Sequence, residues 1–187
     1  IAADVLVNGN LYAPDLEHDV IGSEPEWCLG PEYLLLRQAI TEYTSKDPPW
    51  RDQPTRAIIT MGGSDIVELT PTVIRAFDGF DLRVDAVVGP GFSVEQEDTI
   101  RKVAENVRAD VRVVRNPENL PERMFQADFA VTTASTTTYE LLALGTPIIN
   151  LPVVDNQKLI ADALGECDAA TVLEDTAGVD AFSDAIA

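Results

Sequence analysis

The chain has few basic residues. Its 187 residues include 13 lysines and arginines against 32 aspartates and glutamates, which gives 13 − 32 = −19. The only lysines are Lys46, Lys102 and Lys158. No basic stripe is present to displace counterions from a phosphate backbone, so we expect no nucleic-acid binding. A small phosphorylated ligand stays compatible with this charge, because helix N-termini and backbone amides bind anions locally.

An acidic, lysine-poor surface is typical of proteins from salt-loving microbes, in which salt screens the repulsion between carboxylates. We therefore expect a halophilic protein, and an ordinary acidic cytosolic protein is the alternative. Cys28 and Cys167 are isolated, and neither belongs to a C-x-x-C pair. This usage favours a reducing compartment with inert thiols, and we expect a cytoplasmic location.

Long apolar runs are also missing. No segment reaches the roughly 18 apolar residues of a membrane span and no signal peptide is visible, so we expect no membrane insertion. The chain begins at Ile1 rather than Met, which suggests a fragment.

His18 is the only histidine and stands near Asp15, Glu17 and Asp19. The spacing of these four residues matches no defined metal site, so we expect neither a metal nor a cofactor. Ser-His or Cys-His chemistry would have one possible base, and no nucleophile motif surrounds it. The sequence leaves the catalytic residues unknown.

The chain is long enough for one domain with a sizeable core, and 45% of its residues are hydrophobic. Its first 55 residues differ from the rest. We predict a strand over 3–7, an irregular stretch over 8–26, and a helix over 30–43 with Pro31 in its first turn. The Pro-rich linker at 45–54 is a segment that no helix or strand could cross.

From residue 56 onward, strands alternate with helices. We predict strands over 57–61, 82–88, 111–114, 129–132, 147–151 and 170–173. We expect one helix to begin with Thr70 as its cap. Further helices are expected over 93–108, 121–126, 136–144, 156–164 and 179–186, and Ser93 and Gln96 should form a capping box at the start of the first of these. This alternation implies parallel pairing and right-handed crossovers, hence an α/β, Rossmann-like three-layer domain with a mainly parallel sheet.

Polar residues follow three of these strands, at the edge where open α/β sheets bind ligands. The first group is Gly62, Gly63 and Ser64, which suits either a phosphate-facing turn or an ordinary tight turn. It meets neither the G-x-G-x-x-G nor the P-loop fingerprint, which argues against a dinucleotide-binding oxidoreductase.

The second group is Ser135, Thr136 and Thr137, with Glu140 one turn further along the same helix face. A ligand site and a plain helix cap with a solvated Glu140 are both compatible with it. The third group, Asn156 and Gln157 after Asp155, suits sugar hydroxyls or a capped helix start equally well.

Taken together, these segments resemble the carboxyl-terminal half of a GT-B-fold nucleotide-sugar protein. The group that contains the UDP-sugar hydrolase of pseudaminic-acid synthesis and the spore-coat-polysaccharide-type predicted glycosyltransferases is the most similar. The resemblance rests on G-P-E-Y-L-L-L-R at 30–37, I-I-T-M-G-G-S-D at 58–65, N-P-E-N-L-P-E-R-M from Asn116, T-T-Y-E-L-L-A-L-G-T-P at 137–147 and D-N-Q at 155–157.

The resemblance implies a UDP or UDP-sugar ligand. Gly62, Gly63 and Ser64 would line the phosphate side, and the backbone of Asn119 and Leu120 would face the uracil. The remaining implied roles are diphosphate binding for Ser135, Thr136 and Thr137, ribose binding for Glu140, and sugar binding for Asn156 and Gln157.

The family usually has two glycines where this chain has Ala134 and Ser135. The resemblance also implies that residues 1–55 are the end of a missing amino-terminal domain plus a linker, and that 56–187 form the nucleotide-sugar-binding domain. The complete enzyme would hydrolyse or transfer the sugar, and the fragment alone would be inactive. A non-catalytic binding or regulatory module with the same fold is the rival interpretation.

Overall fold

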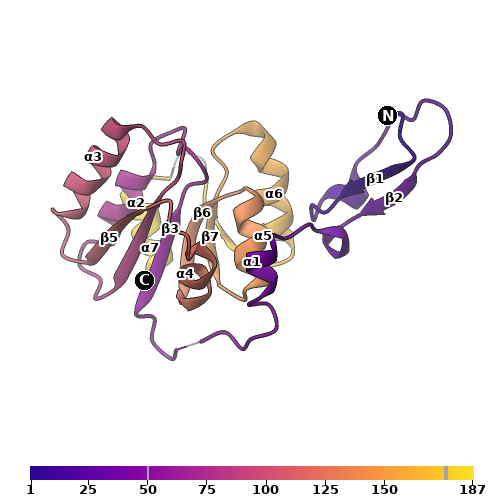
Figure 1. The fold of residues 1–187 in the computed structure, drawn as a ribbon. Coiled ribbons are helices and arrows are strands. Elements are labelled where there is room, and N and C mark those ends of the chain that lie inside the picture. Colours follow the sequence, from indigo (N-terminus) through magenta and orange to yellow (C-terminus); the bar gives the residue numbers. More distant parts are fainter. Residues whose placement is uncertain (50, 175–176) are drawn as a thin grey trace.

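The computed structural model describes residues 1–49, 51–174 and 177–187. Its main body is a six-stranded sheet in which every neighbouring pair of strands is parallel, in the order β5-β4-β3-β6-β7-β8 (Figure 1). The strands are β3 (Arg56–Thr60), β4 (Arg83–Val88), β5 (Asp110–Arg115), β6 (Phe129–Thr133), β7 (Ile148–Leu151) and β8 (Thr171–Val172). The predicted α/β class with a parallel sheet is confirmed.

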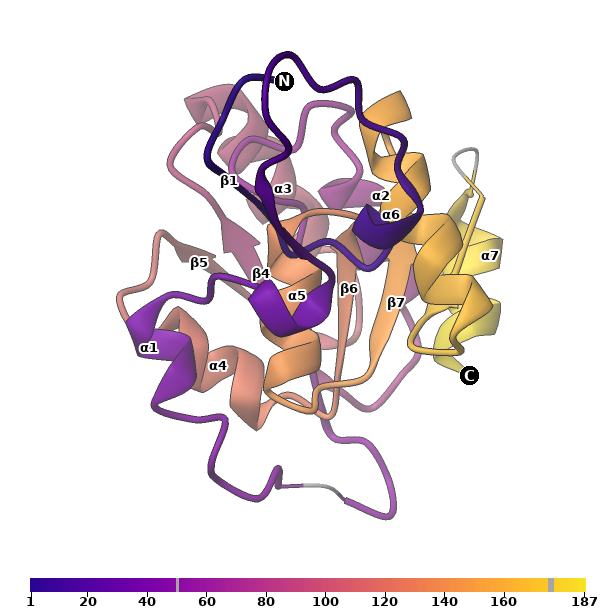
Figure 2. The ribbon, with the colours of Figure 1, turned by 90° about the vertical axis from the view of Figure 1, so that its right-hand side faces the viewer.

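Helices cover both faces of this sheet (Figures 1 and 2). One layer contains α2 (Thr70–Ala76), α3 (Val94–Ala104) and α7 (Val179–Ile186). The other contains α1 (Gln38–Thr41), α4 (Leu120–Gln126), α5 (Thr136–Ala143) and α6 (Asp155–Glu166).

The alternation of side chains along β3 explains the three layers. Ala57 and Ile59 belong to the buried cluster of the first layer. This cluster includes Phe77, which directly follows α2, and Phe182 of α7. Ile58 belongs instead to the cluster formed with α4 and α5. Because both faces are covered, the strand reads as a continuous apolar run.

Two helix starts illustrate local control by side chains. The capping box of α3 is confirmed: Ser93 N–H donates to Gln96 Oε1 at 2.8 Å, and Gln96 N–H donates to Ser93 Oγ at 3.1 Å. The prediction that Thr70 caps α2 is wrong. The carboxylate of Asp65 instead accepts the N–H groups of Leu69 and Thr70, at 2.9 and 2.8 Å.

The first residues form a separate two-stranded parallel sheet of β1 (Val5–Asn8) and β2 (Glu26–Leu29), joined through a 3₁₀ turn at Ala13–Asp15. It projects from the main body (Figure 1). The strand β2 and this turn fall where no periodicity indicated an element.

The predicted helix over 30–43 is wrong. A 3₁₀ turn at Pro31–Tyr33 is followed by extended backbone at Leu34 and Arg37, before the four residues of α1. Tertiary contacts explain the break: Leu34 packs against the cluster around Tyr139, Leu36 against the cluster around Ile40, and Arg37 pairs with Glu140. These contacts use the side chains of 34–37 in an extended segment and override helix propensity.

The predicted linker runs along the bottom of the domain in Figure 1 without helix or strand in its described part, residues 45–49 and 51–54; Trp50 lies outside the described residues. Asp128 anchors its end by accepting the N–H groups of Thr55 and Arg56, at 2.7 and 2.9 Å, and by pairing with Arg51 at 2.5 Å. This carboxylate holds the start of β3 beside the start of β6.

Candidate functional site

The strand order reverses between β3 and β6. From β3 the chain moves outward through β4 to β5, and then returns to place β6 on the other side of β3. Thr60 and Thr132 are register partners at the carboxyl ends of these two strands. Such a switch point is where open α/β sheets leave a crevice for a ligand.

A cavity of about 560 Å³ opens at this point. Its lining joins predicted site residues from three separate segments, namely Gly62, Gly63, Leu120, Thr136, Thr137 and Glu140. The volume falls within the range of small-molecule sites in proteins. The structure therefore gathers most of the predicted nucleotide site around one hollow.

The glycine turn after β3 is held by the loop after β4. Gly62 has φ 71°, in the left-handed region that favours glycine. A Cβ on Gly63 would meet no atom within 4 Å, so the backbone here is open to a ligand. The Gly63 carbonyl accepts the N–H of Gly91 at 2.9 Å, which ties the two loops together.

Ser64 is the exception in this turn. It is absent from the cavity lining, and its carbonyl accepts a long 3.4 Å hydrogen bond from the side chain of Gln96. Ser64, which is predicted to bind phosphate, thus lies at the margin of the cavity.

The start of α5 presents Thr136 and Thr137 to the cavity. Thr138, one residue on, has a structural part instead: its hydroxyl donates to the Thr133 carbonyl at 3.0 Å and accepts from Ser135 N–H at 3.3 Å and Asn150 Nδ2 at 3.0 Å. These bonds fix the turn between β6 and α5. The helix N-terminus then faces the cavity with its partial positive charge.

Ala134 has its side chain in the core. The residue is fully buried in a cluster with Tyr139, Ile160, Ala161 and Leu164, and it is absent from the cavity lining. The methyl group packs between residues of α5 and α6. Ser135 likewise lies outside the lining, at the edge of the turn.

Glu140 forms the clearest charged contact of the site. Arg37 Nε lies 2.5 Å from Oε1 of Glu140, and Arg37 Nη2 lies 2.7 Å from Oε2. The hydrogen bonds that Arg37 donates to Glu140 are the main cause that raises the pKa of the Arg37 guanidinium above its ordinary value. The glutamate is 8% exposed, so it is not the solvated helix residue of the alternative interpretation.

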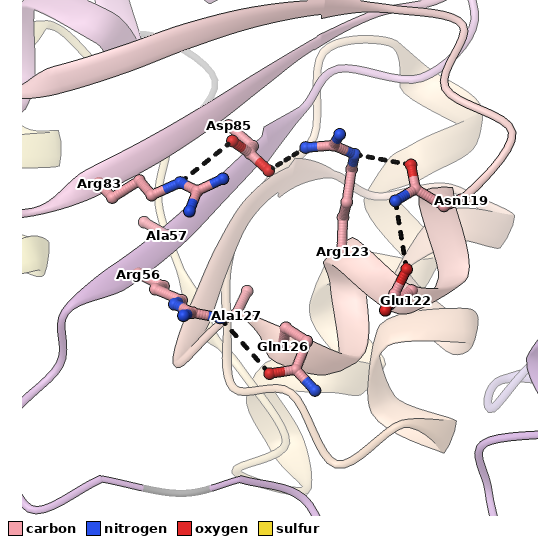
Figure 3. Close-up of a pocket in the computed structure, with 9 residues that line it drawn as sticks. All are labelled: Arg56, Ala57, Arg83, Asp85, Asn119, Glu122, Arg123, Gln126 and Ala127. Carbon is pink, nitrogen blue, oxygen red and sulfur yellow. Dashed lines mark hydrogen bonds and ion pairs between the residues drawn. The ribbon is translucent and has the colours of Figure 1, made fainter.

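Leu120 lines the cavity, whereas Asn119 faces a second, smaller hollow of about 210 Å³ beside the first halves of β3 and β4 (Figure 3). There its side chain accepts from Arg123 at 2.9 Å and donates to Glu122 at 3.2 Å. Arg123 also pairs with Asp85 at 2.5 Å. The polar groups around this hollow largely satisfy one another, and the hollow lies away from the carboxyl edge, so we place the site in the larger cavity.

Asn156 and Gln157 are not brought to the cavity lining. Gln157 Oε1 accepts the N–H of Val153 at 2.9 Å, which secures the start of α6. Asn156 is exposed beside it. In this structure Gln157 thus stabilises a helix start, which is the alternative to sugar binding given by the sequence.

His18 and the acids near it form no metal centre: the structure, over its described residues, has no group of three or more His, Cys, Asp or Glu placed to hold an ion. The His18 ring stacks on Trp27 of β2, with ring centroids 5.2 Å apart. Across the same residues, no helix is long and apolar enough to cross a membrane.

Sequence reasoning missed several lining residues, among them Leu35, Arg37, Gly89, Pro90 and Glu118. Arg37 is the last letter of the G-P-E-Y-L-L-L-R segment, whose match to a family gave no role to its arginine. Its partner is 103 positions away, a separation that no local spacing rule can detect.

Comparison with known proteins identifies distant relatives and supports the fold. No family model matches it. It is 27% identical over 165 residues to the uncharacterized protein MJ1062 of Methanocaldococcus jannaschii, with 77% of this chain and 33% of that protein covered. It is 24% identical over 172 residues to the spore coat polysaccharide biosynthesis protein SpsG of Bacillus subtilis, with 90% and 49% covered. The chain thus spans half or less of the length of these relatives.

Solved structures agree on the fold. MurG of Acinetobacter baumannii superposes with a TM-score of 0.62 at 13% identity, over 88% of this chain and 47% of that one. The spinosyn rhamnosyltransferase SpnG, in its complex with thymidine diphosphate, gives 0.52 at 19% identity, over 74% and 38%. The six-stranded α/β domain therefore has the Rossmann-like, glycosyltransferase-like fold of GT-B proteins.

Proposed function

We propose that this chain is the nucleotide-binding half of a nucleotide-sugar enzyme of surface-polysaccharide synthesis, and that its cavity binds UDP or a UDP-sugar. Residues 1–55 would be the end of an amino-terminal domain plus a linker, and residues 56–187 the nucleotide-sugar-binding domain. The missing domain would carry the catalytic residues. The chain alone would then bind the ligand without turning it over.

One observation carries the proposal. At the switch point of a parallel sheet, a single cavity joins the open backbone of Gly62 and Gly63, the start of α5 at Thr136, and the buried carboxylate of Glu140. Backbone amides and a helix N-terminus suit a diphosphate, and a fixed carboxylate suits vicinal hydroxyls. A nucleoside diphosphate presents these two chemistries side by side.

Each predicted residue has a part in this arrangement. Gly62 and Gly63, with Ser64 at the margin, would face one side of the diphosphate. Thr136 and Thr137, beyond Ser135, would donate to its other side. The backbone at Asn119 and Leu120 would meet the base, Glu140 would accept hydrogen bonds from the ribose, and Asn156 and Gln157 would approach the sugar beyond the diphosphate.

Two reactions fit this half equally. In both hydrolysis and transfer, negative charge develops on the departing diphosphate, and preorganised donors at that position stabilise the transition state. The name of SpsG, a polysaccharide biosynthesis protein, and the transferase names of two structural neighbours support a sugar-nucleotide substrate. The choice between water and an acceptor belongs to the missing domain.

Isothermal titration calorimetry in high salt tests the proposal directly. We expect UDP to bind more tightly than ADP, GDP or thymidine diphosphate, and a UDP-sugar to compete with it. No heat and no melting shift with millimolar UDP, on protein shown by circular dichroism to be folded, would refute it. Equal stabilisation by every nucleotide would favour the rival, a non-catalytic module with the same fold.

The role of Glu140 is tested with two ligands that differ by one hydroxyl. If the carboxylate holds the ribose, the wild type prefers UDP over 2′-deoxy-UDP, and Glu140→Ala removes that preference at a cost of roughly 1.5–3 kcal/mol in UDP affinity. Glu105→Ala, which removes an exposed carboxylate outside the cavity lining, is the control and should leave both affinities unchanged. A preference for UDP that survives Glu140→Ala would assign the ribose to another residue.

A further inference from the structure

Arg37 is the only basic residue lining the cavity in the part of the chain that the structure describes. The acidic lining residues are Glu118 and Glu140, and the whole chain carries a net charge of −19. A nucleoside diphosphate is itself an anion. The cavity of the proposed function therefore needs a source of positive charge beyond its helix N-terminus.

The geometry of the Arg37–Glu140 pair leaves that charge in place. Only Nε and Nη2 of Arg37 bond to the carboxylate, at 2.5 and 2.7 Å. Nη1 has no hydrogen-bond partner among the residues that the structure describes. A guanidinium has five N–H donors and a fixed planar shape, so two-point pairing orients the group and still leaves donors for a ligand.

Burial divides the two partners unequally. The side chain of Arg37 is 55% exposed and that of Glu140 is 10% exposed. The glutamate is thus the buried, fixed member of the pair in the cavity lining, and the arginine is the accessible member. Without Arg37, the cavity would present two carboxylates and would repel a phosphate in proportion to the phosphate charge.

We propose that Arg37 is the residue by which this cavity recognises the negative charge of a nucleoside diphosphate, with Glu140 holding the guanidinium in place. The inference rests on the proposed function and adds to it a specificity-determining residue. Arg37 lies in the extended segment between the β1–β2 sheet and α1. Recognition of the diphosphate would then involve the connection into the domain as well as the domain itself.

Affinities for a series of ligands with increasing charge test this role. Uridine, UMP and UDP are titrated into wild type, Arg37→Ala and Arg37→Lys at one ionic strength. We expect Arg37→Ala to weaken UDP about tenfold or more, UMP less, and uridine by less than about twofold. Arg37→Lys should recover part of the UDP affinity, because it restores the charge without the two-point geometry.

Two controls separate this role from general effects. Arg112→Ala removes an equal charge from a residue outside the cavity lining, one that pairs with Asp110. It should leave the UDP-to-uridine affinity ratio unchanged. Because Arg37→Ala leaves the buried Glu140 carboxylate without its partner, the ratio is also compared between Glu140→Gln and the double variant Arg37→Ala/Glu140→Gln, in which no unpaired charge remains. Of these last two variants, only the double variant should have a lower UDP-to-uridine affinity ratio.

Three results would overturn the inference. An equal loss for uridine and UDP would make Arg37 a mere support for Glu140. Tighter UDP binding by Arg37→Ala would make the arginine a blocker of the ribose position. Wild-type protein that binds none of the three ligands would refute the proposed function itself, and the inference with it.

Discussion

The carbonyl oxygen of Gly63 lies directly against Gly89, on the loop that follows the neighbouring strand. A Cβ atom built on Gly89 would fall 2.6 Å from that oxygen, and the N–H of Gly91 donates to the same oxygen at 2.9 Å. The loop after β4 therefore fixes the position of the glycine turn after β3; we call this its template role. The position of the proposed phosphate-binding backbone depends on a residue that contributes no side chain.

Gly89→Ala tests this dependence. The added methyl group must push the Gly63 carbonyl away, so we expect a loss of about 1–3 kcal/mol in the free energy of unfolding, typical of overpacking. We also expect weaker UDP binding. Urea denaturation and calorimetry measure the two effects. Gly63→Ala is the matched control for stability, since its Cβ would meet nothing within 4 Å; if both variants unfold at the same urea concentration, the template role is wrong.

The fold was predictable because its signals are local and repeated. Apolar runs such as Ile58 and Ile59 in β3, and polar punctuation such as Ser93 and Gln96 before α3, give the element types and their order. In a parallel sheet with right-handed crossovers, that order also fixes which loops share the carboxyl edge. Gly62, Thr136 and Glu140 could therefore be assigned to one edge from the sequence pattern, whereas Leu120 was assigned to the site only through the resemblance to GT-B-fold proteins.

The remainder depends on contacts between distant segments. Nothing near Arg37 in the sequence shows that it pairs with Glu140, and nothing near Asp65 shows that its carboxylate replaces Thr70 as the cap of α2. The segment 30–43 has helix-compatible residues, yet its side chains are needed in an extended stretch over three different neighbours. Short segments with strong tertiary contacts are where local propensity fails.

Asn156 provides a test of the sugar end of the site. Because it is exposed and lies outside the cavity lining, Asn156→Ala should leave UDP affinity unchanged. If it meets the sugar as proposed, the same change should weaken a UDP-sugar by about 0.5–1.5 kcal/mol, the range of one neutral hydrogen bond. Competition titrations measure both values. Equal affinity of the variant and the wild type for every UDP-sugar tried would remove Asn156 from the site.

Asp128 gives a prediction for the pH dependence of stability. Burial alone would raise the pKa of its carboxyl, but the N–H of Thr55, the guanidinium of Arg51 and the N–H of Arg56 together hold that pKa below its ordinary value. Its contribution is then complete above the unfolded-state pKa of about 3.9 and is lost as the pH falls through the lower folded-state value.

We therefore expect Asp128→Asn to be less stable than wild type at neutral pH by about 1–3 kcal/mol, with the difference shrinking below about pH 4. Urea denaturation at fixed salt, from about pH 7 to about pH 2, measures the two curves. Asp162→Asn, on the exposed face of α6, controls for the loss of one negative charge. A constant difference between Asp128→Asn and wild type across this range would show that the ionised carboxylate contributes nothing special.

Salt dependence tests the interpretation of the charge. With 32 acidic and 13 basic residues, most carboxylates have no cation to pair with, and their mutual repulsion should destabilise the compact state at low ionic strength. Raising KCl shortens the Debye length from about 10 Å at 0.1 M to about 3 Å at 1 M, so the melting temperature should rise. Screening saturates as the Debye length shortens, whereas exclusion of salt from the surface keeps growing with concentration. We therefore expect most of the rise in melting temperature to occur below about 1 M KCl. Scanning calorimetry at a series of KCl concentrations measures it. A melting temperature that stays flat or falls over this range would mean that surface ion pairs such as Arg101–Glu97, which salt weakens, outweigh the repulsion, and would contradict a halophilic adaptation.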